Sequence, residues 1–152
     1  MQKIWLLIAV CFGLIAQPSL ADQAQNSPAE IGRIKNVTPN GVNIISRVAG
    51  DRAARSGFRL YEGDIIETAA NGRVGITFID DTRIAVAPGS RMIISSYRFN
   101  RARLEGSSQM DVVRGKVGVD SGQLSSTGNM RFRAGQSTLG VRGTHFVIEV
   151  DD

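Results

Sequence analysis

The chain has 152 residues, of which 42% are hydrophobic, and its 18 Lys and Arg against 14 Asp and Glu give a formal net charge of +4. A single cysteine and a single histidine exclude a disulfide framework, a cysteine-based metal site and a multi-histidine metal site. The length fits one domain, and the charge is mildly basic rather than that of a polycation.

The first 21 residues predict an export signal. A short basic start, Met1 to Lys3, precedes an apolar run from Ile4 to Ala16. The small residues Ser19 and Ala21 then suit a cleavage site after Ala21, so we expect a periplasmic protein. The run of 13 residues is too short to cross about 30 Å of hydrocarbon, and no transmembrane span is expected to remain. The alternatives are an uncleaved anchor and an acylated Cys11, and the unbroken apolar run argues against acylation.

The remainder of the chain predicts one all-β domain. Residues 22–29 offer nothing to bury and are expected to form a flexible leader, followed by a single domain over residues 30–152. From position 22 onward there are 12 Ile and 12 Val but only 4 Leu. Since β-branched side chains pack well on a pleated surface, this ratio favours strands over helices.

Short apolar runs between turn residues predict the individual strands. They cover residues 31–37, 42–48, 64–68, 73–79, 82–87, 91–99, 109–119, 129–134, 138–142 and 144–150. Their spacing fits a β-solenoid-like stack and a sandwich equally well. At most one short helix is expected, over residues 51–56, because Gly57 follows as a helix stop. The polar and basic residues 100–108 are expected to link two sheet segments.

Two features invite a catalytic interpretation. Asp80 and Asp81 are adjacent, but neighbours in a strand or turn point apart and aspartate favours turns, so we predict a turn. His145 would suit a Ser-His-Asp arrangement. Its strand phase instead places it opposite the core residue Phe146, where an exposed imidazole near Glu149 needs no catalytic role. We therefore predict no catalytic residue, no metal site and no cofactor.

A basic cluster with interleaved aromatics is the best candidate binding surface. It consists of Arg98, Arg101 and Arg103, with Tyr97 and Phe99 between and beside them. Such a cluster suits an anionic envelope polymer or an acidic protein surface, whereas nucleic acid is not an expected partner of an exported chain. A solvated linker explains the same residues, because short arginine clusters on loops commonly have no ligand.

Four segments resemble the FecR domain family in order and spacing. They are L-Y-E-G-D-I-I-E-T at 60–68, G-R-V at 72–74, D-D-T at 80–82 and G-V-R-G-T-H-F at 140–146. The resemblance extends from about Ile31 to Val150. The chain departs from the family at Asp81-Thr82, which usually reads Gly-Ser, and at Ala134-Gly135, which commonly reads Thr-Pro. Neither departure breaks the frame.

The resemblance implies an all-β domain whose motif residues shape a scaffold. Gly63 and Gly143 are expected at tight reversals or close backbone approaches. Arg142 is expected to hold carbonyls or a carboxylate, and Thr144 and Phe146 to start the last core strand. The full set of matching structural positions is Gly63, Asp64, Thr68, Asp81, Arg142, Gly143, Thr144 and Phe146.

The family's best-known members are membrane-spanning regulators whose periplasmic domain relays iron-siderophore signals to a cytoplasmic sigma-factor-binding segment. This chain resembles the exported domain alone, so the resemblance implies binding or signalling outside the cytoplasm and does not imply iron regulation. Our leading hypothesis is a non-enzymatic periplasmic module that binds an envelope protein through a strand edge or the surface of residues 98–103. The second is a carbohydrate or anionic-polymer binder, which two Tyr and no Trp in the exported part weaken. The third is an uncharacterised hydrolase.

Overall fold

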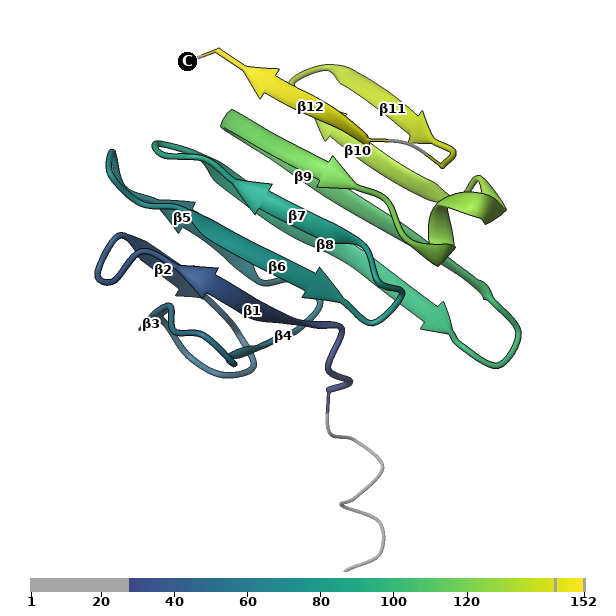
Figure 1. Ribbon diagram of the computed structural model, residues 1–152, viewed down its shortest axis with the longest axis horizontal. Helices are drawn as coiled ribbons and strands as arrows, with labels where there is room; N and C mark the ends of the chain where they lie inside the picture. Colours follow the sequence, from purple (N-terminus) through teal and green to yellow (C-terminus); the bar gives the residue numbers. More distant parts are fainter. Residues whose placement is uncertain (1–27, 144, 152) are drawn as a thin grey trace, which may run out of the picture.

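The computed structural model describes residues 28–143 and 145–151, and this part of the chain is all-β, as predicted (Figure 1). The predicted export signal, residues 22–27 of the predicted leader, and Thr144 lie outside the described residues. The strands are β1 (Gly32–Val37), β2 (Val42–Ile45), β3 (Arg52–Ala53), β4 (Arg59–Leu60), β5 (Ile65–Thr68), β6 (Val74–Phe78), β7 (Arg83–Val86), β8 (Arg91–Asn100), β9 (Glu105–Asp120), β10 (Met130–Ala134), β11 (Ser137–Val141) and β12 (His145–Val150). One 3-10 turn, η2 (Gln123–Thr127), follows β9.

The strands form one continuous sheet that folds over on itself into two layers (Figure 1). Sheet A, as we name the first layer, has the order β4-β1-β6-β7-β9-β12, and sheet B has the order β3-β2-β5-β8-β9-β10-β11. Among the described strands, only the pairing of β9 with β10 is parallel. A solenoid would require repeated parallel rungs, so the pairings correspond to the sandwich.

Strand β9 belongs to both sheets. Its residues 105–114 pair with β8 in sheet B, and its residues 115–120 pair with β12 in sheet A. The strand turns between the layers at Gly115, which has φ +81°. A Cβ atom at this position would lie 2.7 Å from Cα of Ser90, whose hydroxyl accepts a hydrogen bond from the Lys116 amide. Only glycine fits there without displacing the neighbouring backbone.

The core lies between the two sheets and is filled by alternate residues of each strand. The predicted inward positions Val74, Ile76 and Phe78 are all buried in β6. Two aromatic contacts join the layers. Phe78 stacks on Tyr97 of β8 with ring centroids 5.1 Å apart, and Phe132 of β10 meets Phe146 of β12 edge-on at 5.4 Å.

The helix expected over residues 51–56 is wrong. This segment contains β3, which pairs with β2 through Ile44 and Arg52, and the Ala54 amide donates to the Val42 carbonyl at 2.8 Å. The exposed edge of β2 offers these backbone hydrogen bonds, and a turn and a half of isolated helix has too few of its own to compete. Gly57 does have the positive φ expected of it, but in a turn between strands.

The linker expected over residues 100–108 is only a tight turn. Strand β8 continues to Asn100 and β9 starts at Glu105, so the basic stretch forms the tip of a long hairpin. The helical turn of the described structure is η2, where Leu124 is fully buried. The segment that forms η2 is too short for a helical sequence pattern to predict it.

Replacing Gly115 with alanine tests the bend in β9. We expect Gly115→Ala to lower the free energy of unfolding by about 2–4 kcal/mol, because it combines a positive φ with a steric conflict against Ser90. Gly140→Ala is the matched control, since an added Cβ meets nothing within 4 Å there. Chemical denaturation followed by far-ultraviolet circular dichroism measures both. Equal stability of the two variants would contradict this role of Gly115.

Candidate functional site

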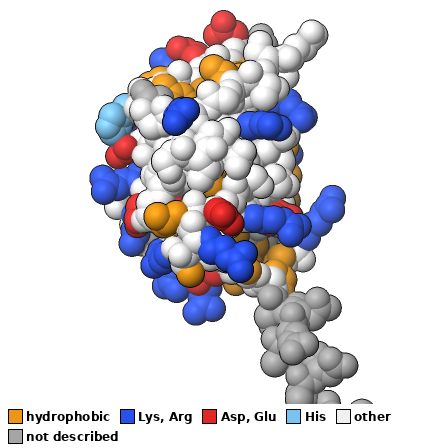
Figure 2. All heavy atoms as spheres, turned by 90° about the vertical axis from the view of Figure 1, so that its right-hand side faces the viewer, with side chains coloured by type: hydrophobic (Ala, Val, Ile, Leu, Met, Phe, Trp, Pro, Cys, Tyr) orange, Lys and Arg blue, Asp and Glu red, His pale blue; other side chains and the backbone are white. Residues whose placement is uncertain are grey.

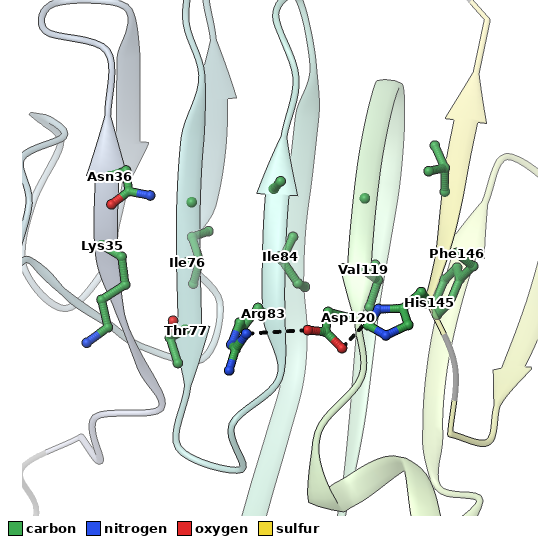
Figure 3. Close-up of a pocket in the computed structure, with 14 residues that line it drawn as sticks. Lys35, Asn36, Ile76, Thr77, Arg83, Ile84, Val119, Asp120, His145 and Phe146 are labelled. Atoms are coloured by element: carbon green, nitrogen blue, oxygen red, sulfur yellow. Dashed lines mark ion pairs between the residues drawn. The ribbon is translucent and has the colours of Figure 1, made fainter.

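A shallow groove crosses the outer face of sheet A (Figure 3). It consists of two adjoining hollows of roughly 670 and 560 Å³, a size typical of ligand-binding clefts. Strand register aligns the residues common to both hollows in one row across five strands. This row, the floor of the groove, is Asn36, Gly75, Ala85, Gly118 and Val147.

The floor is low because its central residues have almost no side chain. Gly75 of β6 and Gly118 of β9 flank Ala85 of β7 in direct register. Neither glycine has a positive φ. A Cβ on Gly118 would come no closer than 4.0 Å to the Ala85 carbonyl oxygen, and one on Gly75 no closer than 3.4 Å to Asn36. The backbone therefore does not require glycine at these positions, although glycine weakens a strand interior.

Charged side chains border the groove on both sides. On one side Asp120 lies between Arg83, at 3.7 Å, and the Nδ1 atom of His145, at 3.1 Å (Figure 3). On the other side Lys116 pairs with Glu149 at 3.0 Å. The Arg83, Asp120, Lys116 and Glu149 side chains are at least 40% exposed, so these pairs contribute little stability. Their positions leave an apolar floor between two polar margins.

His145 occupies the predicted strand phase, but its acidic neighbour is Asp120 rather than Glu149. Its side chain is 80% exposed. Thr77 and Thr38 are the hydroxyl-bearing residues that line the two hollows. Thr77 lies three strand spacings from His145, which is roughly 14 Å, and Thr38 follows β1, one strand further away. A nucleophile and its base must lie within hydrogen-bond reach, so neither threonine forms such a pair with His145. Within residues 28–143 and 145–151, no three His, Cys, Asp or Glu side chains gather as a metal site requires.

Asp80 is fully buried and ties three segments together. Its carboxylate accepts hydrogen bonds from the Tyr97 hydroxyl at 2.5 Å, from the Thr82 hydroxyl at 2.7 Å and from the Leu124 amide at 3.1 Å. Burial, together with the hydrogen bond to Asp80, raises the pKa of Tyr97. Asp81 has φ +68° in the turn after β6 and accepts a hydrogen bond from Gln123. The two aspartates thus point in different directions.

Two more family-motif residues lie in buried polar contacts between loops. Asp64 is fully buried, and its carboxylate accepts hydrogen bonds from the Ser46 hydroxyl and, at 3.0 Å, from the Tyr61 amide. The Thr68 hydroxyl donates to the Ala87 carbonyl at 2.6 Å and accepts from the Ser90 amide at 2.8 Å. Such contacts satisfy groups that would otherwise be costly to bury.

The remaining motif residues lie in turns or at the last strand. Gly63 has φ +87° in the turn before β5, and Gly143 has φ +52° in the turn before β12. Arg142 is exposed beside Gly143. Phe146 contributes the edge-on contact with Phe132 that joins the layers.

The basic cluster lies on sheet B and at the tip of the β8–β9 hairpin, apart from the groove. Arg98, Arg101 and Arg103 are all exposed, and Arg101 also donates a hydrogen bond to the Ile79 carbonyl at 2.5 Å. Leu104, 52% exposed, follows Arg103 in the turn. On the face that Figure 2 shows, which is the right-hand side of Figure 1, Lys and Arg side chains gather mainly over the lower half. Tyr97 is buried in the core and does not join the surface.

The groove was not predicted from the sequence, although a signal for it exists. In V-G-I at 74–76, I-A-V at 84–86 and V-G-V at 117–119, a small residue stands at the outward position between two buried β-branched residues. Each triplet alone is unremarkable in composition. Only the strand register shows that the three small residues are neighbours.

Comparison with known proteins gives one match. The model of the family described as FecR protein matches residues 64–152, more than half of the chain. No curated protein and no solved structure matches the chain. In the described residues there is no helix long and apolar enough to cross a membrane.

The contact between Tyr97 and Asp80 has a testable pH signature. A phenol in the unfolded chain loses its proton near pH 10, whereas burial keeps Tyr97 protonated in the folded state. Above that pH we expect this residue to reduce the free energy of unfolding by about 1.4 kcal/mol per pH unit, and Tyr97→Phe to abolish that share of the slope.

At neutral pH, Tyr97→Phe is expected to cost about 1–3 kcal/mol, because the buried Asp80 loses a donor. Tyr61→Phe leaves the contacts of Asp80 intact and is expected to change stability by less than about 0.5 kcal/mol. Urea titrations at pH 7 and between pH 9 and 11 provide both measurements. Identical pH slopes for wild type and Tyr97→Phe would refute the buried contact.

Proposed function

The chain belongs to the FecR protein family, and from this premise we propose that it is a non-enzymatic signalling module of the cell envelope that binds a protein partner in the groove of sheet A. The family indicates a signal-transduction-related envelope protein. The groove supplies the surface on which such a protein contacts its partner.

The observation that carries this proposal is the pair of glycines in the groove floor. Gly75 and Gly118 have room for a side chain and need no positive φ, yet they leave the floor empty next to Ala85. Glycine in a strand commonly marks a site where another chain or a ligand approaches closely. Val147, 64% exposed, adds an apolar contact at the end of the same row.

The lining of the groove favours a protein over a sugar. Carbohydrate sites stack sugar rings on exposed aromatic faces. Phe146 is the one aromatic residue among those that line either hollow, and its ring packs on Phe132. An apolar floor between charged margins instead resembles the centre and rim of a protein interface.

We propose no enzymatic activity because the groove lacks the surroundings that a catalytic histidine needs. The family is a regulatory one, and the imidazole of His145 lies on an open sheet face with Asp120 as its neighbour. Catalytic pairs of this kind act where water is excluded and a nucleophile is in reach.

A second candidate function is supported by the tip of the β8–β9 hairpin. Arg98, Arg101 and Arg103 are exposed there together with Leu104. Three cations beside an exposed apolar side chain suit an anionic envelope polymer such as lipopolysaccharide. Binding of this kind would weaken steeply with added salt if charge alone supports it.

Export is part of the proposed function and has a simple spectroscopic test. If the chain is cleaved after Ala21, the isolated protein starts at Asp22 and has lost Trp5 and Cys11. We expect protein recovered from the periplasm of expressing cells to show no tryptophan emission when excited at 295 nm and no thiol titre. A full tryptophan signal in that fraction would contradict cleavage.

Filling the groove is expected to abolish partner binding. Ala85→Gln places a longer side chain on the floor without touching the core, because Ala85 is exposed on the outer face. In affinity capture from envelope extract of the source cells, we expect this variant to recover at least tenfold less of any protein that the wild type retains. Ala53→Gln, at an exposed position of strand β3 away from the groove and the hairpin tip, is the matched control. Undiminished recovery by Ala85→Gln would contradict the groove as the binding surface.

A further inference from the structure

The two sheets do not end together at the β11 and β12 end of the molecule (Figure 1). β12 and β10 both pair with β9, in sheets A and B respectively, and the contact of Phe146 with Phe132 shows that they face each other. Sheet B continues with β11, which pairs with β10. Among the strands that the structure describes, sheet A has none beyond β12. One strand position opposite β11 is therefore vacant.

The inner face of β11 is apolar and incompletely covered. Leu139 lies directly across from Phe132 in the antiparallel pair and so points to the same side. Phe132 is fully buried, whereas Leu139 is 43% exposed. Val141, on the same face at the end of β11, is buried, so the incompletely covered part of this face lies at Leu139. Phe146 and Val150 of β12 are likewise only partly buried.

The free edge of β12 supplies the second half of the same vacancy. This strand pairs with β9 on one side, and among the described residues it has no strand partner on the other. Between Phe146 and Val150, the alternate residues that direct their amides and carbonyls away from β9 present these groups to an added strand. At the opposite end of the sandwich, β3 and β4 have only two residues each, which is how proteins limit pairing at an edge.

We propose that an extended segment of the protein partner adds to β12 as an antiparallel strand and covers Leu139. This inference deepens the proposed protein-binding function by naming the form of the partner. Backbone hydrogen bonds to β12 would supply part of the affinity, and apolar side chains at alternate positions of the segment would pack against Leu139 and Val150. A single extended segment fits beside β12. A second copy of this chain, paired through its own β12, would bring its own β10 into the position that β11 occupies.

Charge at the two ends of β12 indicates which way the segment runs. The exposed Arg142 lies just before β12 and the exposed Asp151 just after it. An antiparallel segment therefore fits best with a basic residue at its amino end, near Asp151, and an acidic residue at its carboxyl end, near Arg142. Antiparallel pairing is also slightly more stable per residue than parallel pairing.

The probe is a synthetic peptide, acetyl-Lys-Val-Thr-Val-Thr-Val-Thr-Val-Asp-amide, added to the protein as isolated from cells that express the full chain. A dye-labelled peptide and fluorescence anisotropy give its affinity. We expect binding, and at least tenfold weaker binding to Leu139→Asp, which places a charge on the inner face. Thr138→Asp is the matched control on the outer face of the same strand, since its partner Arg133 is exposed, and is expected to bind as the wild type does. A scrambled peptide with contiguous valines is expected not to bind.

Two further peptides, N-methylated either at every valine or at every threonine, test strand pairing itself. Because only alternate residues of an added strand direct their amides toward β12, we expect one of these peptides to lose binding and the other to retain it. Equal binding of both would overturn the proposal, as would equal binding to Leu139→Asp and Thr138→Asp. Circular dichroism shows that each variant is folded.

Sedimentation of the protein without peptide tests the competing occupant. We expect a monomer, and a dimer that Leu139→Asp dissociates would assign the edge to a second copy and overturn the proposal. Failure of the groove as the binding surface would appear separately, as unchanged partner capture by Ala85→Gln. The two conclusions can therefore be distinguished.

Discussion

A single strand, β9, belongs to both sheets, and the bend at Gly115 allows it to cross between them. Its first part carries β8 and β10, and its second part carries β7 and β12. The offset between the layers follows from this arrangement. Beyond β9, sheet A has one strand, β12, and sheet B has two, β10 and β11. Both surfaces to which we assign protein binding, the groove and the free edge of β12, depend on this one strand.

Several polar family-motif residues are used inside the molecule rather than on its surface. Asp64 and Asp80 are fully buried and accept hydrogen bonds from loops that are distant in sequence. The Thr68 hydroxyl both donates a hydrogen bond to the turn before β8 and accepts one from it. Removing one partner from such a network leaves a buried polar group unsatisfied, which is costly. These contacts position the turns, and they leave the exposed side of sheet A available for another molecule.

The strands could be predicted because their information is local. Period-two alternation at Val74, Ile76 and Phe78 identifies both the strand and its buried face. The helix expected over residues 51–56 failed because hydrogen bonds to β2, made across several intervening residues, outweighed a local stop signal at Gly57. The groove could not be predicted, since it depends on the register that brings Gly118 beside Ala85 from 33 residues away. The vacancy opposite β11 depends on strand order, which no local pattern contains.

The most direct test of this account is residue-resolved amide hydrogen exchange of β12 in the isolated protein, measured by nuclear magnetic resonance. Amides bonded to β9 should be protected, and the intervening amides, which face the free edge, should exchange at close to the rates of an unstructured peptide. That alternating pattern would show an edge open to an added strand. Uniform protection along β12 would mean that the edge is already covered, and would contradict the account.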